Sequence, residues 1–192
     1  MAPVTCDSLT GWTQGSPVIA LNSGFGNPSP CLDGSAANSS YCYADLGGYP
    51  SQILIDMYAG SLNDFFFMCN SSGHGQLVRN ECRAGNKSGY GTSTSWTSWV
   101  GPSSGPTNPA NAWNHFQLDL FGQVAGVSAG SVNVTINGVF VATIASLNAL
   151  GTYIGVQSDG LATGGAYWDN LVVRFAAKSY NISQAVKRAS NF

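Results

Sequence analysis

The stretch Trp113-Asn-His-Phe-Gln-Leu-Asp-Leu-Phe121 decides the fold, because its apolar and polar side chains alternate with a period of two. The apolar positions are Phe116, Leu118 and Leu120, and the polar positions are His115, Gln117 and Asp119. Successive side chains of a β-strand point to opposite faces of its sheet. The segment 113–121 is therefore predicted to be a strand with one buried and one polar face.

The segment 131–145 continues this pattern and adds a turn. Its apolar positions before the turn are Val132, Val134 and Ile136. Asn137-Gly138 follows, and Asn-Gly between two β-rich runs is a strong hairpin signal because both residues tolerate positive φ. The same alternation turns Asn133 and Thr135 outward. A hairpin is predicted here, with its sequon accessible.

The rest of the chain consists of short β-rich runs separated by turn residues, many of them among the 24 Gly and 8 Pro. The predicted strands lie near 17–21, 41–46, 51–58, 64–70, 75–82, 93–100, 113–121, 131–137, 139–145, 152–157 and 166–175. Such spacing favours an all-β, antiparallel two-sheet sandwich. One domain is expected over 1–176, with 101–111 as a loop inside it.

Residues 177–192 differ from this pattern and form a separate C-terminal arm. Asn181 is a candidate N-cap, with Gln184 three residues later, so a short helix is one interpretation. A frayed terminus is the other. As a helix, the arm would suit docking onto a neighbouring copy of the chain.

Charge content and the length of the apolar runs argue against two classes of partner. Charged residues make up 8% of the chain, the net charge is −2, and Lys and Arg together number 7. Nucleic-acid binding needs clustered basic residues and is not expected. No apolar run reaches the roughly 18 residues of a membrane span, so membrane insertion is not expected either.

The five cysteines indicate disulfides rather than a zinc or redox site, because no Cys-x-x-Cys pair occurs. Disulfides imply an oxidising compartment. Cys69 with Cys82 would join neighbouring strands, and Cys31 with Cys42 would close a loop rich in Ser and Asn. Cys6 is then free, joins two chains, or replaces a partner in one of these pairs. Five reduced thiols in a cytosolic protein are the alternative.

Sequons for N-glycosylation also favour an extracellular, cell-surface or virion-surface location. They begin at Asn38, Asn70, Asn86, Asn133 and Asn181. The N-terminus lacks the basic segment and apolar core of a signal peptide. We expect either a mature form with an added Met or another route of release, such as lysis.

Several segments of the second half resemble the concanavalin A-like lectin/glucanase superfamily, in particular its laminin-G-like domains. The matching segments are Trp113-Asn-His-Phe-Gln-Leu-Asp-Leu120, Val132-Asn-Val-Thr-Ile-Asn-Gly138, Gly151-Thr-Tyr-Ile-Gly-Val-Gln157 and Ala166-Tyr-Trp-Asp-Asn-Leu-Val-Val173. The opening Asp7-Ser-Leu-Thr-Gly-Trp12 also resembles the family's entry. The resemblance covers about half of the chain. It implies a jelly roll whose first and last strands are adjacent and whose curved face meets carbohydrate in many relatives.

The resemblance also carries expectations about metal and catalysis. In many relatives a structural calcium ties the first strand to the last, which implies a site at Asp7 and Asp169; hydrogen bonds from Asp169 and Asn170 to nearby backbone are the alternative. Glucanase relatives carry Glu-x-Asp-x-x-Glu, and this chain has only Glu81. An Asp pair stays open, but no catalytic residue is predicted.

Sugar binding requires aromatic faces beside amide and hydroxyl groups. The candidate carbohydrate-binding residues are Trp96 or Trp99, together with Trp113, His115 and Gln117; Trp12 and Trp168 are expected in the core. The preferred function is therefore non-catalytic carbohydrate binding or adhesion. A structural glycosylated subunit of an extracellular filament or virion surface is the main alternative, and a divergent glycan-degrading enzyme is a weaker one.

Overall fold

The fold is an antiparallel sandwich of two seven-stranded sheets. A computed structural model of the chain describes residues 4–28, 30–36, 40–59, 65–69, 76–81, 87–92, 95–100, 112–122, 130–147, 151–158 and 166–176. In β6 to β9 and most of β12, the backbone alone is described. No helix long and apolar enough to cross a membrane occurs in these ranges.

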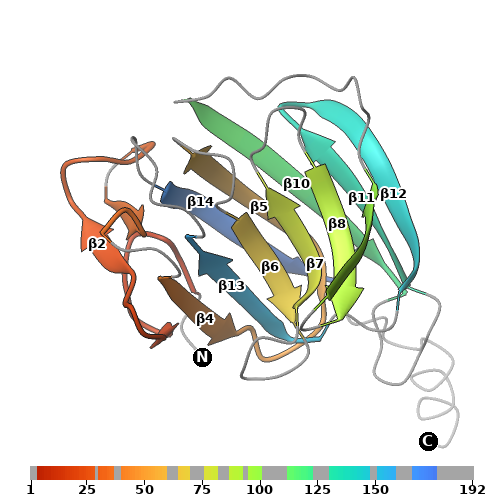
Figure 1. The fold of residues 1–192 in the computed structure, drawn as a ribbon, viewed down its shortest axis with the longest axis horizontal. Helices are drawn as coiled ribbons and strands as arrows, with labels where there is room; N and C mark the ends of the chain where they lie inside the picture. Colours follow the sequence, from red (N-terminus) through yellow and green to blue (C-terminus); the bar gives the residue numbers. More distant parts are fainter. Residues whose placement is uncertain are drawn as a thin grey trace, which may run out of the picture.

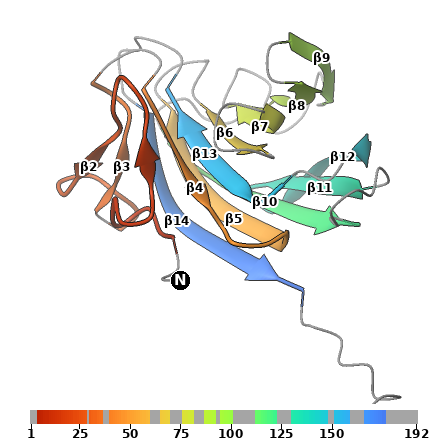
Figure 2. The same ribbon diagram turned by 90° about the horizontal axis from the view of Figure 1, so that it is seen from below.

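Sheet 1 contains, in spatial order, β1 (Thr13–Gln14), β4 (Tyr41–Asp45), β13 (Tyr153–Gln157), β6 (Phe65–Cys69), β7 (Gln76–Glu81), β8 (Lys87–Thr92) and β9 (Ser95–Val100). Sheet 2 contains β12 (Val139–Leu147), β11 (Gly130–Ile136), β10 (Trp113–Phe121), β5 (Pro50–Ala59), β14 (Ala166–Phe175), β3 (Cys31–Asp33) and β2 (Ala20–Asn22). Figures 1 and 2 show the two sheets as separate layers.

The core lies between the sheets, and the predicted alternation supplies it. Along β10 and β11, every second side chain is buried, as the sequence pattern predicts. The largest fully buried side chains include Phe116, Met57 and Trp168. Trp12 is also buried, so both tryptophans expected in the core lie there. Truncating a buried aromatic such as Phe116 to Ala costs about 3–5 kcal/mol.

The Asn137-Gly138 turn joins β11 to β12 as predicted. Both residues have positive φ, 50° at Asn137 and 78° at Gly138, which matches the right-handed twist of the two strands. A Cβ added at Gly138 would meet no atom within 4 Å. Glycine is therefore required at this position by backbone conformation and not by space.

One expectation about topology is wrong. The first strand, β1, pairs with β4 in sheet 1, whereas the last strand, β14, lies between β3 and β5 in sheet 2. The first and last strands are therefore not adjacent, although Cys6 and Asp7, which precede β1, lie close to Asp169 of β14. The residues around Asp7 form no strand; Trp12 anchors that segment through a 2.8 Å hydrogen bond from its Nε1–H to the Thr5 carbonyl.

Candidate functional site

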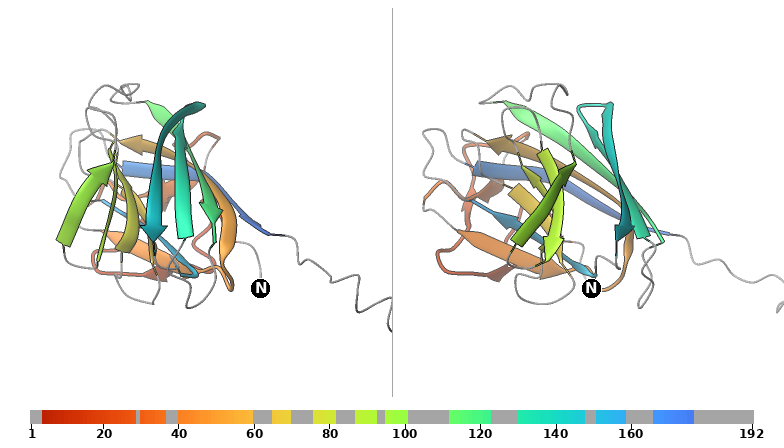
Figure 3. Two further views of the ribbon diagram at one scale, coloured as in Figure 1. Left: turned by 90° about the vertical axis from the view of Figure 1, so that its right-hand side faces the viewer. Right: turned by 45° about the vertical axis from the view of Figure 1, so that its right-hand side comes forward.

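The candidate site is the outer face of sheet 2, meaning the side turned away from the core. Since paired residues share a face, the strand registers arrange its side chains in rows. From β14 outward to β12, the four rows are Tyr167, Tyr58, Trp113; Asp169, Asp56, His115; Val172, Leu54, Gln117, Thr135, Phe140; and Arg174, Gln52, Asp119, Asn133, Thr143. Figure 3 shows the strands that carry these rows side by side.

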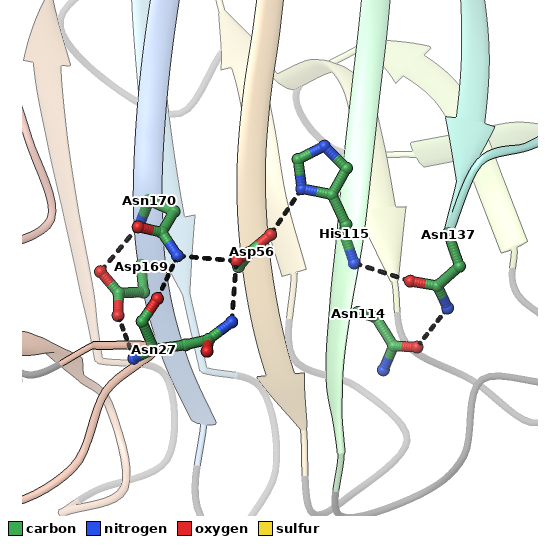
Figure 4. A network of polar contacts seen from close by, with 7 residues as sticks. All are labelled: Asn27, Asp56, Asn114, His115, Asn137, Asp169 and Asn170. Carbon is green, nitrogen blue, oxygen red and sulfur yellow. Dashed lines mark hydrogen bonds and ion pairs between the residues drawn. The ribbon is translucent and has the colours of Figure 1, made fainter.

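An aspartate–histidine pair occupies the centre of the face. His115 Nδ1 lies 2.6 Å from Asp56 Oδ1. The His115 side chain is 48% exposed and that of Asp56 is 9% exposed. A carboxylate only accepts hydrogen bonds, so it fixes the proton on Nδ1 and leaves Nε2 of the neutral imidazole as an acceptor. Figure 4 shows that second nitrogen on the side of the ring away from Asp56.

The other oxygen of Asp56 holds the loop that precedes β3. Asp56 Oδ2 accepts hydrogen bonds from Asn27 Nδ2 at 3.1 Å and from Asn170 Nδ2 at 2.8 Å. Asn170 has a φ of 51° and lies at a register irregularity of β14. This backbone turn directs the Asn170 amide toward Asp56 and Asn27 (Figure 4). Asp56 is therefore a fixed group that orients His115.

Asp169 accepts two backbone hydrogen bonds, as one of the two sequence interpretations predicts. Its Oδ1 accepts from the Asn170 N–H at 2.7 Å, and its Oδ2 accepts from the Asn27 N–H. Burial raises the pKa of Asp169 above its ordinary value of 3.8; the two backbone donors oppose this increase, and the nearby Asp7 and Asp56 charges add to it. A carboxylate held in this way is a structural connection between β14 and the 23–28 loop.

The same contacts bear on the calcium expected at Asp7 and Asp169. Asp7 is exposed, and both Asp169 oxygens already have backbone partners. In the described part of the chain, no group of three or more acidic, His or Cys side chains is arranged to hold a metal ion. Calcium takes six to eight oxygen ligands, and backbone and amide carbonyls can supply some of them. Calcium stays a prediction, and comparing Tm in calcium and in chelator tests it.

A second polar network covers the part of the face beyond His115. The Gln52 side chain accepts a hydrogen bond from the Arg174 guanidinium and donates through Nε2 to Asp119 Oδ1 at 2.6 Å. Gln117 Nε2 donates to Asp119 Oδ2 at 2.8 Å. Three neighbouring strands therefore present a guanidinium, two amides and a carboxylate in fixed positions. Such pre-ordered polar groups lose little conformational freedom when a ligand binds.

An aromatic cluster closes one end of the face. Phe25, from the 23–28 loop, packs on Tyr167 with ring centroids 4.3 Å apart, on Tyr58 at 5.1 Å and on Trp113 at 5.7 Å. Tyr58 also meets Trp113 at 5.7 Å. All four rings are partly buried. The 23–28 loop and this cluster border the polar part of the outer face. One face of the Trp113 ring is covered by Phe25.

Sequence reasoning missed the most exposed ring on this face. Phe140 is 59% exposed and pairs with Thr135, so it lies in the same row as Gln117. Phe121, at the end of β10, is also exposed. The period-two pattern of 139–145 could have placed Phe140 outward, but the pattern does not give its register against β11. Asp56 was also missed, because identifying it as the partner of His115 requires the register of β5 against β10.

The structure brings together three of the predicted carbohydrate-binding residues and separates the others. Trp113, His115 and Gln117 lie on the outer face of β10. Trp96 and Trp99 lie on β9, at the edge of sheet 1, and their side chains are outside the described residues. Trp96 and Trp99 therefore lie on a strand of the other sheet from Trp113, and a shared role of these tryptophans in binding stays a prediction.

The cysteine prediction is wrong at the pair that the structure describes. Cys31 and Cys42 are free, buried thiols on β3 and β4, strands of opposite sheets. Cys6 is also free and buried, and a free Cys6 was one of the predicted alternatives. Burial raises the pKa of Cys31 to about 12 and also raises the pKa values of Cys6 and Cys42. The pairing of Cys69 with Cys82 lies outside the described residues.

Of the sequons, only Asn133 lies in the described part of the chain. It is partly exposed on the outer face, where its Oδ1 accepts a 2.7 Å hydrogen bond from Thr143 Oγ1. The others, Asn38, Asn70, Asn86 and Asn181, lie outside the described residues, as does the arm 177–192. Glycosylation and self-association through the arm stay predictions.

Comparisons with known proteins give a fold and no closer relationship. No protein-family model matches the sequence, and no curated protein matches it. The endo-β-1,4-glucuronan lyase of the fungus Trichoderma reesei matches the structure with a TM-score of 0.57 and 12% identity, over 90% of this chain and 94% of the lyase. A tetrameric galectin from the ball sponge Cinachyrella sp. has a TM-score of 0.50 and 10% identity, over 70% of this chain and 99% of the galectin. The chain thus has the concanavalin A-like jelly-roll fold predicted from its second half.

Proposed function

We propose that the chain is a non-catalytic carbohydrate-binding domain that uses the outer face of sheet 2. One observation carries the proposal: exposed and partly exposed side chains of β5, β10 and β14 are held in a hydrogen-bonded array beside exposed aromatic rings. Gln117 and Asp119 supply an amide and a carboxylate, and Phe140 supplies a ring in the Gln117 row. Sugars are recognised by such a combination of hydrogen bonds and ring contacts.

The position of His115 adds to this argument. Its Nε2 is an acceptor for a sugar hydroxyl when the imidazole is neutral, because Nδ1 is committed to Asp56. Gln117 lies next to it on the same face of β10. A sugar ring lying along β10 would reach both side chains. A galectin and a glucuronan lyase share the fold, which is compatible with this function, although fold does not determine function.

A glycan array followed by calorimetry tests the proposal. Gln117→Ala and His115→Ala should each lower the affinity for the bound glycan about tenfold, because each removes one hydrogen bond to ligand worth roughly 1–1.5 kcal/mol. Thr13→Ala is the matched control, since Thr13 is exposed on β1 of sheet 1. Absence of binding to every glycan, or equal losses in all three variants, would refute the proposal.

Catalysis on the same face is a second candidate, favoured by the Asp56–His115 pair. A carboxylate that fixes a histidine tautomer also prepares that histidine to act as a general base. Release of reducing ends or of an unsaturated product from a polysaccharide, lost in His115→Ala, would support this candidate. Stable binding of an intact polysaccharide without product would support the non-catalytic domain.

The proposal also includes display outside the cell. The sequon Asn133-Val-Thr135 supports this location, because both polar side chains are outward on β11. Glycosidase treatment of the protein from its native source should lower its mass if the sequon is used. An unchanged mass for the peptide containing Asn133 would contradict that part of the proposal.

A further inference from the structure

We infer that the outer face of sheet 2 selects neutral, hydroxyl-rich glycans over anionic ones, and that Asp119 is the residue that determines this selectivity. The inference rests on the proposed function, because it names the class of glycan for the same face. Its evidence is the sign and placement of the charges on sheet 2, which the binding proposal does not use.

The charges of the face are mainly negative. Within the described side chains of sheet 2, the acidic groups in the outer-face rows are Asp33, Asp56, Asp119 and Asp169, of which Asp33 and Asp119 are partly exposed, and the basic group is the exposed Arg174. Arg174 donates to the neutral amide of Gln52 and keeps its positive charge. His115 carries a charge only when protonated. A uronate or sulfate placed on this face would therefore meet more negative than positive charge.

Asp119 is the carboxylate best placed to meet a ligand. Asp56 and Asp169 are buried and engaged with Asn27 and Asn170. Asp33 lies two strands away from β5 and accepts hydrogen bonds from Asn22 Nδ2 and the Ser35 N–H. Asp119 is partly exposed near the middle of the face, between Gln52 on β5 and Asn133 on β11.

The hydrogen bonds of Asp119 leave capacity that a sugar hydroxyl can use. Each carboxylate oxygen offers about two acceptor positions, and each accepts one amide hydrogen in the structure, from Gln52 or Gln117. The remaining positions accept hydroxyl donors, which a neutral sugar supplies. An anionic group has no hydrogen to donate, and it would lie close to a like charge that two amide donors fix in position.

Matched pairs of oligosaccharides test the inference. Gluco-, manno- and galacto-hexaoses are compared with the corresponding hexauronates, which differ by oxidation of C6, and calorimetry measures each affinity. The wild type should bind at least one neutral sugar about tenfold or more tightly than the corresponding hexauronate. This factor is the effect expected from one like charge at roughly 6 Å in an intermediate dielectric. Added salt should narrow this preference, because it screens repulsion between partly exposed charges.

Two variants separate the role of Asp119 from that of net charge. Asp119→Asn should raise uronate affinity about tenfold relative to the neutral sugar. Asp45→Asn removes the same charge from an exposed site on β4 of sheet 1 and should leave the preference unchanged. Asp119→Asn also changes the hydrogen bonds that Gln52 and Gln117 donate to this side chain. The salt dependence of the wild type is therefore an independent readout that needs no substitution.

The outcomes distinguish this inference from the proposed function. A wild type that binds a hexauronate more tightly than its neutral partner overturns the selectivity and leaves carbohydrate binding intact. Equal effects of Asp119→Asn and Asp45→Asn overturn the role of Asp119. Failure to bind any neutral or anionic glycan overturns the proposed function itself.

Discussion

Asn137 pairs with His115 through both its backbone and its side chain. The Asn137 N–H donates to the His115 carbonyl at 2.8 Å, and Asn137 Oδ1 accepts from the His115 N–H at 2.9 Å. Asn137 Nδ2 also donates to Asn114 Oδ1 at 2.9 Å. The tip of the β11–β12 hairpin is thereby fastened to the part of β10 that carries the site histidine (Figure 4).

Removing the Asn137 side chain should loosen this part of the site. Asn137→Gly keeps the positive φ without strain but loses both side-chain hydrogen bonds, so we expect a loss of about 1–2 kcal/mol in the free energy of unfolding and weaker glycan binding. Asn137→Asp keeps an acceptor for the His115 N–H but loses the donor to Asn114 Oδ1, so it should recover only part of the lost stability. Denaturant melts and calorimetry measure both effects. An Asn137→Gly variant as stable as the wild type would contradict this role of the side chain.

Asp169 should make the protein less stable as pH rises through the pKa of its carboxyl group. Burial raises that pKa in the folded state, so between the unfolded value of 3.8 and the folded value the native state binds more protons than the unfolded state. The contribution is thus fully present below the unfolded pKa and is lost above the folded pKa. The Asp169→Asn variant has no titratable group at this position, so it serves as the reference for the wild type.

The measurement for Asp169 is therefore a difference between two stability curves. The stability of the wild type minus that of Asp169→Asn should decrease as pH rises above 3.8, and it should become constant once the carboxyl group of the folded protein is ionised. A difference that grows with pH would show a lowered pKa. It would also show that the two backbone donors outweigh burial.

Three thiols should resist alkylation until the protein unfolds. Burial raises the pKa of Cys31 to about 12, and the Cys6 and Cys42 thiols are buried as well. The reactive thiolate is therefore scarce, and reagents do not reach it. Labelling with and without denaturant, followed by peptide mass analysis, measures the protection. A Cys31–Cys42 disulfide in the non-reduced peptide map, or rapid native labelling, would contradict the free buried thiols.

Gly15 should be intolerant of any side chain. A Cβ at this position would lie 2.2 Å from Cζ of the Tyr41 ring, and the Gly15 N–H donates to the Tyr41 carbonyl at 2.9 Å. Gly15→Ala must displace β1 or the ring, at a cost of roughly 1–3 kcal/mol. Gly24→Ala is the control, since its nearest atom would be 3.7 Å away. Equal melting temperatures for the two variants would show that Tyr41 moves freely.

Strands with strong alternation of apolar and polar residues were predictable from the sequence. Strands that form only because neighbouring strands pair with them were not. The alternation over 113–121 gives β10 and its buried side chains. In contrast, β8 has the sequence Lys-Ser-Gly-Tyr-Gly-Thr, with two glycines and no apolar period, and was missed. Pairing with β7 and β9 places it in the sheet. The three-residue strand β3 was missed because it is too short to show a period.

The site was only partly predictable for a related reason. Period-two alternation places His115 and Gln117 outward, but it does not identify the residues opposite them. Asp56 becomes a partner of His115 only through the register of β5 against β10. Asn27 is 142 residues from Asp169 in sequence, and their contact depends on the path of the 23–28 loop. Long-range registers and loop paths follow from the packed core and leave no local signal.

Phe140 should contribute to glycan binding, and Trp96 and Trp99 should not. Phe140 is exposed beside the Gln117 row of sheet 2, whereas both tryptophans belong to β9 at the edge of sheet 1. Phe140→Ala removes a ring that can stack on a sugar, so we expect about 1 kcal/mol, or roughly a fivefold loss of affinity. Trp96→Ala and Trp99→Ala are expected to retain the wild-type affinity in the same titration, with circular dichroism to show that each variant is folded. Loss of binding in a folded Trp96→Ala or Trp99→Ala variant, with Phe140→Ala unaffected, would move the glycan site from sheet 2 to sheet 1.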